Sequence, residues 1–143
     1  MTEIKFYESI DDALLKFAVI ISKSNGKWVF CKHKDRNTLE VPGGHREPEE
    51  DILDTAKREL YEETGALDFA IKPICIYSVT DKDNFDGKET FGMLYFAEIH
   101  SFEKALHSEI EKIIITDTLP NNWTYPLIQP KLLAEAKRRG IIS

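Results

Sequence analysis

Long apolar segments are missing from this sequence. Its longest uninterrupted apolar run, Phe17–Ile21, falls far short of the roughly 20 residues that a helix needs to cross a bilayer. The first twelve residues are acidic and mixed, without the basic start and apolar core of a secretory signal. We therefore expect a protein of the cytoplasm with no membrane-spanning segment.

Cysteine is scarce, and common metal and nucleotide motifs are absent. Cys31 and Cys75 stand alone with no CxxC spacing, so we expect reduced thiols in the core. No zinc spacing links the histidines, which we predict to be surface or packing residues: His33, His45, His100 and His107. GxGxxG, P-loop and GxSxG patterns are missing as well, which argues against dinucleotide binding, P-loop chemistry and serine hydrolysis.

Positive charge is in deficit. The chain has 19 Lys and Arg against 25 Asp and Glu, a net charge of −6. This balance argues against broad, sequence-independent nucleic-acid binding, which needs a basic surface. It is compatible with a small anionic substrate, because an acidic site loaded with a divalent cation attracts phosphates. With 143 residues, 42% of them hydrophobic, residues 1–143 are predicted to form one domain with its own core.

The order of apolar runs and turn residues predicts an α/β fold. A hairpin is expected where Ser24-Asn25-Gly26 joins two strands, and a short strand at 39–41 is expected to stop at Pro42-Gly43-Gly44. A helix is predicted from about Glu49 to Thr64, with Gly65 as its stop. The other strands are expected at 14–22, 27–33, 67–80 (most clearly 74–79), 90–99 and 113–116. A last helix is expected from 127 or 131 to 139. Such an order implies a mixed sheet flanked by helices.

The predicted helix carries glutamates beside its apolar stripe. At about 100° per residue, Ile52, Leu53, Ala56 and Leu60 form the core-facing stripe. Glu59 lies roughly 20° outside that stripe and Glu63 just inside it, with Glu62 adjacent to Glu59. Like charges at this spacing repel unless a cation sits between them. Oxygen-only ligands with no nearby His or Cys favour Mg²⁺ or Mn²⁺ over zinc; the alternative is a solvated helix end.

The residues around this helix form a longer pattern. Gly44-x5-Glu50-x7-Arg58-Glu59-Leu60-x-Glu62-Glu63-x-Gly65-Ala66 resembles the Nudix box, preceded by Val41-Pro42-Gly43-Gly44. Seven positions are fixed to one letter, so a chance match at one start point is on the order of 10⁻⁸. Ala66 departs from the bulkier aliphatic that the family prefers. The resemblance implies a Nudix-like α/β/α sandwich.

The resemblance also implies roles for the residues of the box. Glu59, Glu62 and Glu63 would bind Mg²⁺ (or Mn²⁺), helped by the Gly43 carbonyl, with Glu59 or Glu62 as the general base. Arg58 and Glu50 would pair and orient a ligating carboxylate. A downstream acid supplies a further ligand in some members; the candidates here are Glu98, Glu109 and Glu111, with Glu109 preferred among the three. The alternative, ordinary surface charge, is favoured for all three.

Loops outside the box provide candidates for substrate binding. Lys34, Arg36 and Arg46 lie before or inside the approach loop, where they could grip phosphates, and Gly44 allows close approach of a ligand. The segment with Asn121, Asn122 and Trp123 resembles the place where MutT-type members read a purine. The alternative is a turn in which the Trp anchors the last helix.

The family resemblance therefore predicts a MutT-type pyrophosphohydrolase. Its expected substrate is a purine nucleoside triphosphate, oxidised guanine ones included, which it would cut to a nucleoside monophosphate and pyrophosphate. The alternatives are an RNA 5′-pyrophosphohydrolase, an ADP-ribose or dinucleoside polyphosphate hydrolase, and a non-catalytic Nudix-fold nucleotide-binding module. The expected partner is a small nucleotide, with the chain acting as a monomer or homodimer.

Overall fold

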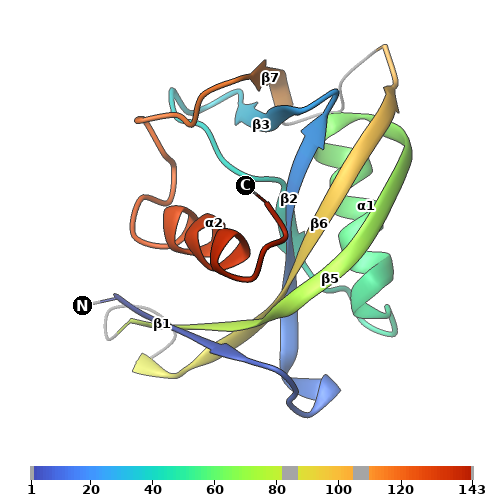
Figure 1. Cartoon of the computed structure of the whole chain (residues 1–143). Coiled ribbons are helices and arrows are strands. Elements are labelled where there is room, and N and C mark those ends of the chain that lie inside the picture. Colours follow the sequence, from blue (N-terminus) through green and yellow to red (C-terminus); the bar gives the residue numbers. More distant parts are fainter. Residues whose placement is uncertain (1, 82–86, 105–109, 143) are drawn as a thin grey trace.

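The computed structural model describes residues 2–81, 87–104 and 110–142. Within these residues the chain forms one sheet and two α-helices (Figure 1). The strands are β1 (Thr2–Tyr7), β2 (Leu15–Ser24), β3 (Lys27–His33), β4 (Gly43–His45), β5 (Ala66–Asp81), β6 (Thr90–Phe102) and β7 (Ile110–Thr116). The helices are α1 (Ile52–Thr64) and α2 (Gln129–Arg138), and a 3-10 turn precedes β2 at Asp12–Leu14. Among the described residues, neither helix has the length and apolar character that crossing a membrane requires.

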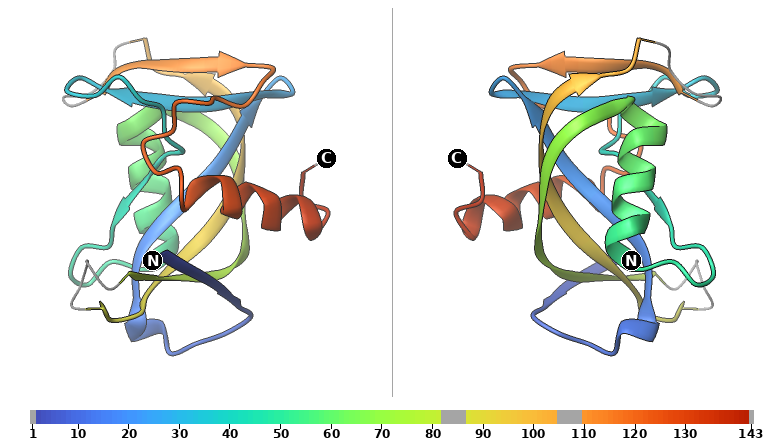
Figure 2. Two further views of the ribbon diagram at one scale, coloured as in Figure 1. Left: turned by 90° about the vertical axis from the view of Figure 1, so that its left-hand side faces the viewer. Right: turned by 90° about the vertical axis from the view of Figure 1, so that its right-hand side faces the viewer.

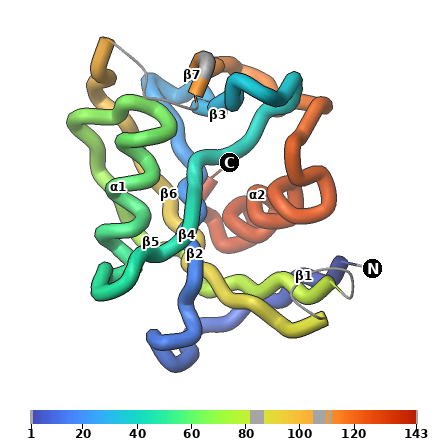
Figure 3. The backbone as a smooth tube through the Cα atoms, turned by 180° about the vertical axis from the view of Figure 1, so that it is seen from behind, coloured from blue at the N-terminus to red at the C-terminus, as the bar shows by residue number. Residues whose placement is uncertain are grey.

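The sheet is mixed, as predicted. Its strand order is β1-β5-β6-β2-β3-β7, with β4 paired to β2 off this path. β2 and β6 run parallel, and the other pairs are antiparallel. β3 pairs with the end of β2 at residues 22–24, whereas β4 pairs with residues 17–19 of the same strand. Figure 3 shows β4 beside β2, with α1 on one side and α2 on the other.

The two helices cover opposite faces of the sheet (Figure 2). Successive side chains of a strand point to opposite faces, so Ala18 and Ile20 of β2 join the cluster under α1, and Ile21 joins the cluster under α2. Ala56 and Leu60 of α1 belong to the first cluster. Leu132, Leu133 and Ala136 of α2 belong to the second. The predicted α/β/α sandwich is confirmed.

The glycine-based turn and helix-end predictions are confirmed. Asn25 and Gly26 have φ of +52° and +78°, the left-handed pair that a tight hairpin turn needs. Gly65 ends α1 with φ of +77°, and its N–H donates to the Tyr61 carbonyl. The predicted start of the helix is wrong, because α1 begins at Ile52 and the chain before it is a loop in which Glu49 has φ of +65°. Glu50 therefore precedes the helix.

The strand predictions need larger corrections. Gly43 and Gly44 do not stop a strand but form β4, because without side chains they can lie directly on β2. The expected strand at 39–41 is reduced to isolated bridges of Glu40 with Cys31 and of Leu39 with Trp123. β5 includes the whole segment 67–80 in which a strand was expected, and it pairs with β1 and β6. β1 was not anticipated, and β7 begins at Ile110 instead of Ile113.

The cluster between α1 and the sheet is expected to hold the helix in place. Leu60 is fully buried there, whereas Leu67 at the start of β5 is 56% exposed. Leu60→Ala should therefore lower the free energy of unfolding by about 2–5 kcal/mol, measured by urea denaturation. Leu67→Ala is the matched control and should change it by less than about 0.5 kcal/mol. Equal losses in both variants would contradict this account of the core.

Candidate active site

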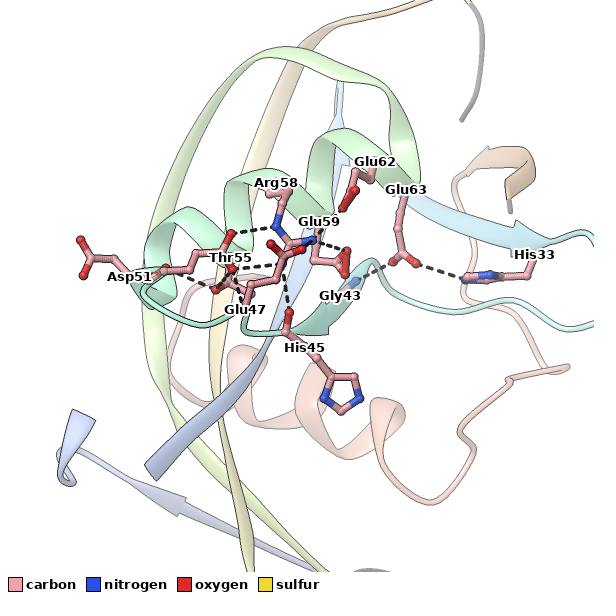
Figure 4. Close-up of polar contacts among 11 residues, drawn as sticks. His33, Gly43, His45, Glu47, Asp51, Thr55, Arg58, Glu59, Glu62 and Glu63 are labelled. Atoms are coloured by element: carbon pink, nitrogen blue, oxygen red, sulfur yellow. Dashed lines mark hydrogen bonds and ion pairs between the residues drawn. The ribbon is translucent and has the colours of Figure 1, made fainter. Parts of the chain in front are cut away.

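β4 and α1 lie side by side and bring the glutamates of the helix to the backbone of the strand (Figure 4). β4 is fixed on β2 by the pairs Val19 with Gly43 and Ala18 with Gly44. The α1 stripe that contains Ala56 and Leu60 packs onto the sheet beside it. Glu59 and Glu63, one helical turn apart, therefore face β4.

Two glycines make this contact close. A Cβ on Gly44 would lie 1.5 Å from Glu59 Oε2, and a Cβ on Gly43 would lie 2.6 Å from the Ala18 carbonyl oxygen. The Gly43 N–H donates to Glu63 Oε1 at 2.8 Å. A larger residue at Gly44 would push strand and helix apart, and one at Gly43 would push β4 away from β2.

The glutamates that face β4 are buried and short of positive charge. The side chains of Glu59 and Glu63 are only 14% and 13% exposed. Burial raises the pKa of Glu63 to about 8, opposed by the Gly43 N–H and reinforced by Glu59 and Glu40. Burial likewise raises the pKa of Glu59 to about 7, although Arg58 opposes the shift. A cation among these carboxylates would reverse both effects.

Glu62 is the third carboxylate beside Glu59 and Glu63, and it is more exposed to solvent than they are. Its side chain is 46% exposed, and Oε1 accepts a hydrogen bond from Arg58 Nη1 at 2.8 Å. Together with Glu59 and Glu63 it offers only carboxylate oxygens, the donors that hard divalent cations prefer. The buried, under-neutralised carboxylates and this donor type fit a divalent cation.

Arg58 ties the loop, the strand and the helix together. Its Nε and Nη2 donate to the two Glu50 oxygens at 2.8 and 3.0 Å, and Nη2 also donates to the His45 carbonyl at 3.0 Å. Glu50 accepts a further hydrogen bond from Thr55 Oγ1 at 2.6 Å. Hydrogen bonds from Arg58 and then Thr55 lower the pKa of Glu50 to about 2. Glu50 is thus a charged anchor for Arg58.

Histidine and cysteine lie closer to the glutamates than the sequence suggested. His33 Nε2 is 3.2 Å from Glu63 Oε2 and 2.8 Å from Glu40 Oε1. The expectation that no His or Cys lies near these carboxylates is therefore wrong. The reason is tertiary: β3 and the chain before β4 run together past the end of α1.

A pocket of about 320 Å³ opens beside the two glycines. Its walls are mainly apolar, with a few polar groups next to Glu63, as in sites that enclose one small molecule. The apolar lining includes Phe17, Val19, Val41, Tyr77, Val79, Ile128 and Leu132, and the polar lining includes His33, Arg36, Glu40, Tyr125 and Gln129. Gln129 Oε1 accepts a hydrogen bond from the Val41 N–H at 2.8 Å.

The two arginines predicted to grip phosphates lie in different places. Arg36 lines the pocket, where its guanidinium lies 6.0 Å from the centre of the Tyr125 ring and pairs with Glu40 at 2.9 Å. Arg46 lies away from this pocket and binds Asp12 and the carbonyls of Leu15 and Glu50. Its contacts hold the loop in place and do not favour a role in phosphate binding.

The segment before α2 contributes a different residue from those predicted. Asn121, Asn122 and Trp123 do not line the pocket. Asn122 Nδ2 donates to the Asn37 carbonyl, and the Trp123 ring packs edge-on against Phe30 at 5.5 Å. These contacts match the alternative of an anchoring turn. Tyr125, two residues further on, lines the pocket; it belongs to the same aromatic segment of the sequence.

Of the three downstream acids, only Glu98 has a side chain among the described residues. Glu109 and the side chain of Glu111 lie outside the described residues. Glu98 on β6 does not line the pocket. A further acidic ligand therefore stays a prediction.

Known proteins resemble this chain in sequence and in fold. The sequence model of the NUDIX domain matches residues 14–122. Bacillus subtilis YtkD, which bears the provisional name 8-oxo-dGTP diphosphatase, is 36% identical over 108 residues; these make up 75% of this chain and only 65% of YtkD. The crystal structure of the Bacillus subtilis pyrophosphohydrolase BsRppH superposes with a TM-score of 0.79 and 29% identity over 99% of this chain and 93% of that one. A NUDIX hydrolase from Nitrosomonas europaea, at 20% identity, shares the fold, with a TM-score of 0.69 over 87% of this chain and 89% of that one.

The raised pKa of the buried glutamates predicts how stability depends on pH when divalent cations are removed. Glu63 titrates at about 8 in the fold instead of at its ordinary 4.5. As pH rises, the unfolded chain loses this proton first. The stabilisation is therefore full below pH 4.5 and is lost as pH passes through about 8. Urea unfolding in a chelator should show the free energy of unfolding falling across this window.

Two variants separate this effect from other titrations. Glu63→Gln stays neutral at every pH, so its stability should fall less steeply. Glu3→Gln, on an exposed position of β1, should keep the wild-type slope. A wild-type free energy of unfolding that stays constant or rises over the window would contradict the burial of Glu63.

Proposed function

The chain belongs to the NUDIX domain family, and we propose that it is a divalent-cation-dependent hydrolase of a phosphoanhydride bond in a nucleoside diphosphate-linked substrate. The observation that carries the proposal is the pair of buried carboxylates, Glu59 and Glu63, held against Gly43 and Gly44 at the edge of the pocket. The whole of residues 1–143 would act as one domain, as a monomer or homodimer in the cytoplasm.

The glutamate set would hold the cation. Glu59, Glu62 and Glu63, with the Gly43 carbonyl, would bind Mg²⁺ or Mn²⁺, which supplies charge neutralisation to the phosphates and lowers the pKa of a water. Either Glu59 or Glu62 would accept the proton of that water; Glu62 is the more exposed of the two. Arg58, positioned by Glu50, would keep both carboxylates in place.

The pocket supports a nucleotide as the substrate. Its apolar walls suit a base, and Tyr125 at its edge offers a ring for stacking. Arg36 lies beside Tyr125 and could meet a phosphate or the base once it leaves Glu40. We propose a purine nucleoside triphosphate, oxidised guanine ones included, cut to a monophosphate and pyrophosphate. The similarity to YtkD supports this choice.

A second candidate is the 5′ end of a triphosphorylated RNA. Such an end presents the same triphosphate and first base, and the chain resembles the pyrophosphohydrolase BsRppH over nearly its whole length. The net charge of −6 disfavours a long contact with the rest of an RNA. ADP-ribose, dinucleoside polyphosphates and a purely binding role are further alternatives that the same assay addresses.

A substrate panel tests the proposed activity directly. Phosphate and pyrophosphate release would be followed with Mg²⁺ and ordinary or oxidised nucleoside triphosphates, ADP-ribose, diadenosine polyphosphates and 5′-triphosphate RNA. Glu62→Gln and Glu63→Gln should each lower turnover by at least about 100-fold, because each removes a charge from the cation site. Asp54→Asn, an exposed acid on the same helix, is the matched control and should retain wild-type turnover. No turnover of any substrate by the folded protein would favour a binding module.

The close approach at Gly44 gives a second test of the site. Gly44→Ala places a methyl group where the Glu59 carboxylate lies, so turnover should fall by about 100-fold, the loss that a displacement of 1 Å can cause. Circular dichroism should show the fold retained. In a Glu59→Ala background there is no carboxylate to displace, so Gly44→Ala should cause little further loss. Additive losses in the double variant would contradict this contact.

A further inference from the structure

A second cluster of ligand-type side chains adjoins the glutamate helix. It consists of Cys31 and His33 on β3, Glu40 in the chain before β4, and Glu63 on α1, and is called the mixed cluster below. One ligand atom from each of the four residues lies within 4.8 Å of every other. Only Glu63 belongs also to the glutamate set described above.

The backbone explains why these side chains converge. Cys31 and His33 are two residues apart on one strand, so they point to the same face. Cys31 and Glu40 exchange both backbone hydrogen bonds, at 2.9 and 3.1 Å, which places their side chains next to each other. Glu63 approaches from α1 and is oriented by the Gly43 N–H. Four rigidly held groups thus meet without belonging to one sequence motif.

The nitrogen and sulfur atoms of the mixed cluster are poorly satisfied. His33 Nε2 is buried and has no hydrogen-bond partner of proper geometry in the described part of the chain, although Glu40 and Glu63 lie 2.8 and 3.2 Å away. The Cys31 thiol is fully buried and makes only a 3.5 Å contact with the Glu40 carbonyl. One Glu40 oxygen pairs with Arg36 and one Glu63 oxygen accepts from the Gly43 N–H. The other oxygen of each nearly buried carboxylate lies against His33 Nε2, where a cation would be stabilising.

We propose that the mixed cluster binds a zinc-class transition-metal ion. One thiolate, one imidazole and two carboxylates form a donor set typical of Zn²⁺ or Co²⁺, whereas Mg²⁺ prefers oxygen ligands alone. Bonds of about 2.1 Å place tetrahedral ligands roughly 3.4 Å apart, so the observed spacing around His33 needs only a small adjustment. The ion can enter from the pocket, which His33, Glu40 and Glu63 line.

Occupation of this site has a consequence for the proposed hydrolase. Glu63 is shared, so an ion in the mixed cluster takes one carboxylate from the set proposed for Mg²⁺. Zinc-class ions therefore oppose Mg²⁺-dependent turnover through the mixed cluster. This consequence rests on the proposed function, whereas the binding of the ion does not.

Cobalt(II) absorption tests the binding itself. Chelator-stripped protein titrated with Co²⁺ should develop a near-ultraviolet thiolate-to-cobalt band and the visible bands of tetrahedral cobalt, saturating at one ion per chain. Cys31→Ala should abolish the thiolate band, and Cys75→Ala should retain it. The two changes are matched, because both cysteines are buried and free but Cys75 lies in the cluster under α2.

His33→Gln keeps the thiol and removes the imidazole, so it should weaken Co²⁺ binding by at least about tenfold. This variant also covers the case in which Cys31→Ala does not fold. A wild-type protein without a thiolate band would overturn the proposal. A band that persists in Cys31→Ala, or unchanged affinity in His33→Gln, would overturn it too.

Glu62→Gln separates the test of metal binding by the mixed cluster from the test of the proposed hydrolase activity. Glu62 is outside the mixed cluster, so this variant should keep the thiolate band while losing Mg²⁺-dependent turnover. Unchanged turnover would count against the proposed hydrolase site alone. Added Zn²⁺ should inhibit wild type and Cys75→Ala at stoichiometric concentration, and equal fractional inhibition of His33→Gln would overturn the role of the mixed cluster.

Discussion

The site depends on one contact, the approach of α1 carboxylates to a strand made of glycine. The Gly43 N–H holds Glu63 at 2.8 Å, and Gly44 leaves room that the Glu59 carboxylate fills. The adjoining apolar stripe of the helix packs its buried Leu60 onto the sheet, so both carboxylates are held at the edge of this packed face. The fold therefore buries two acidic side chains where an apolar contact would be more stable. Such an arrangement is typical of a functional site.

Arg58 supplies part of the positive charge that these carboxylates need. A bidentate pair with Glu50 fixes the guanidinium, and its remaining donors reach Glu59, Glu62 and the His45 carbonyl. The same residue thus joins the loop, β4 and the helix, and supplies positive charge to the set. It does not supply enough for Glu63, which is out of its reach and keeps a pKa near 8. The positive charge that Glu63 lacks is missing on the side of this carboxylate that faces the pocket and His33.

Much of the chemistry is readable from the sequence, because it depends on local spacing. Residues three and four apart on a helix are neighbours, so helical spacing alone places Glu59, Glu62 and Glu63 together. The hairpin at Asn25-Gly26 and the helix end at Gly65 follow from residues that tolerate positive φ. Predictions failed where neighbours came from distant segments, as in the 39–41 strand and in the convergence of Cys31 and His33 on Glu63.

The groups around the pocket show the same division. Arg36 and Tyr125 line the pocket, whereas Arg46 is bound by the loop around Asp12 and Trp123 packs against Phe30. Which member of an aromatic or basic segment faces a pocket depends on how its backbone docks against other strands. The sequence alone determined the helix with its carboxylates, because helical spacing is local. Pairing with β2 decided that Gly43 and Gly44 form the strand that receives the helix. Only the tertiary structure decided the pocket walls and the mixed cluster, because both are built from strands that pair across long stretches of chain.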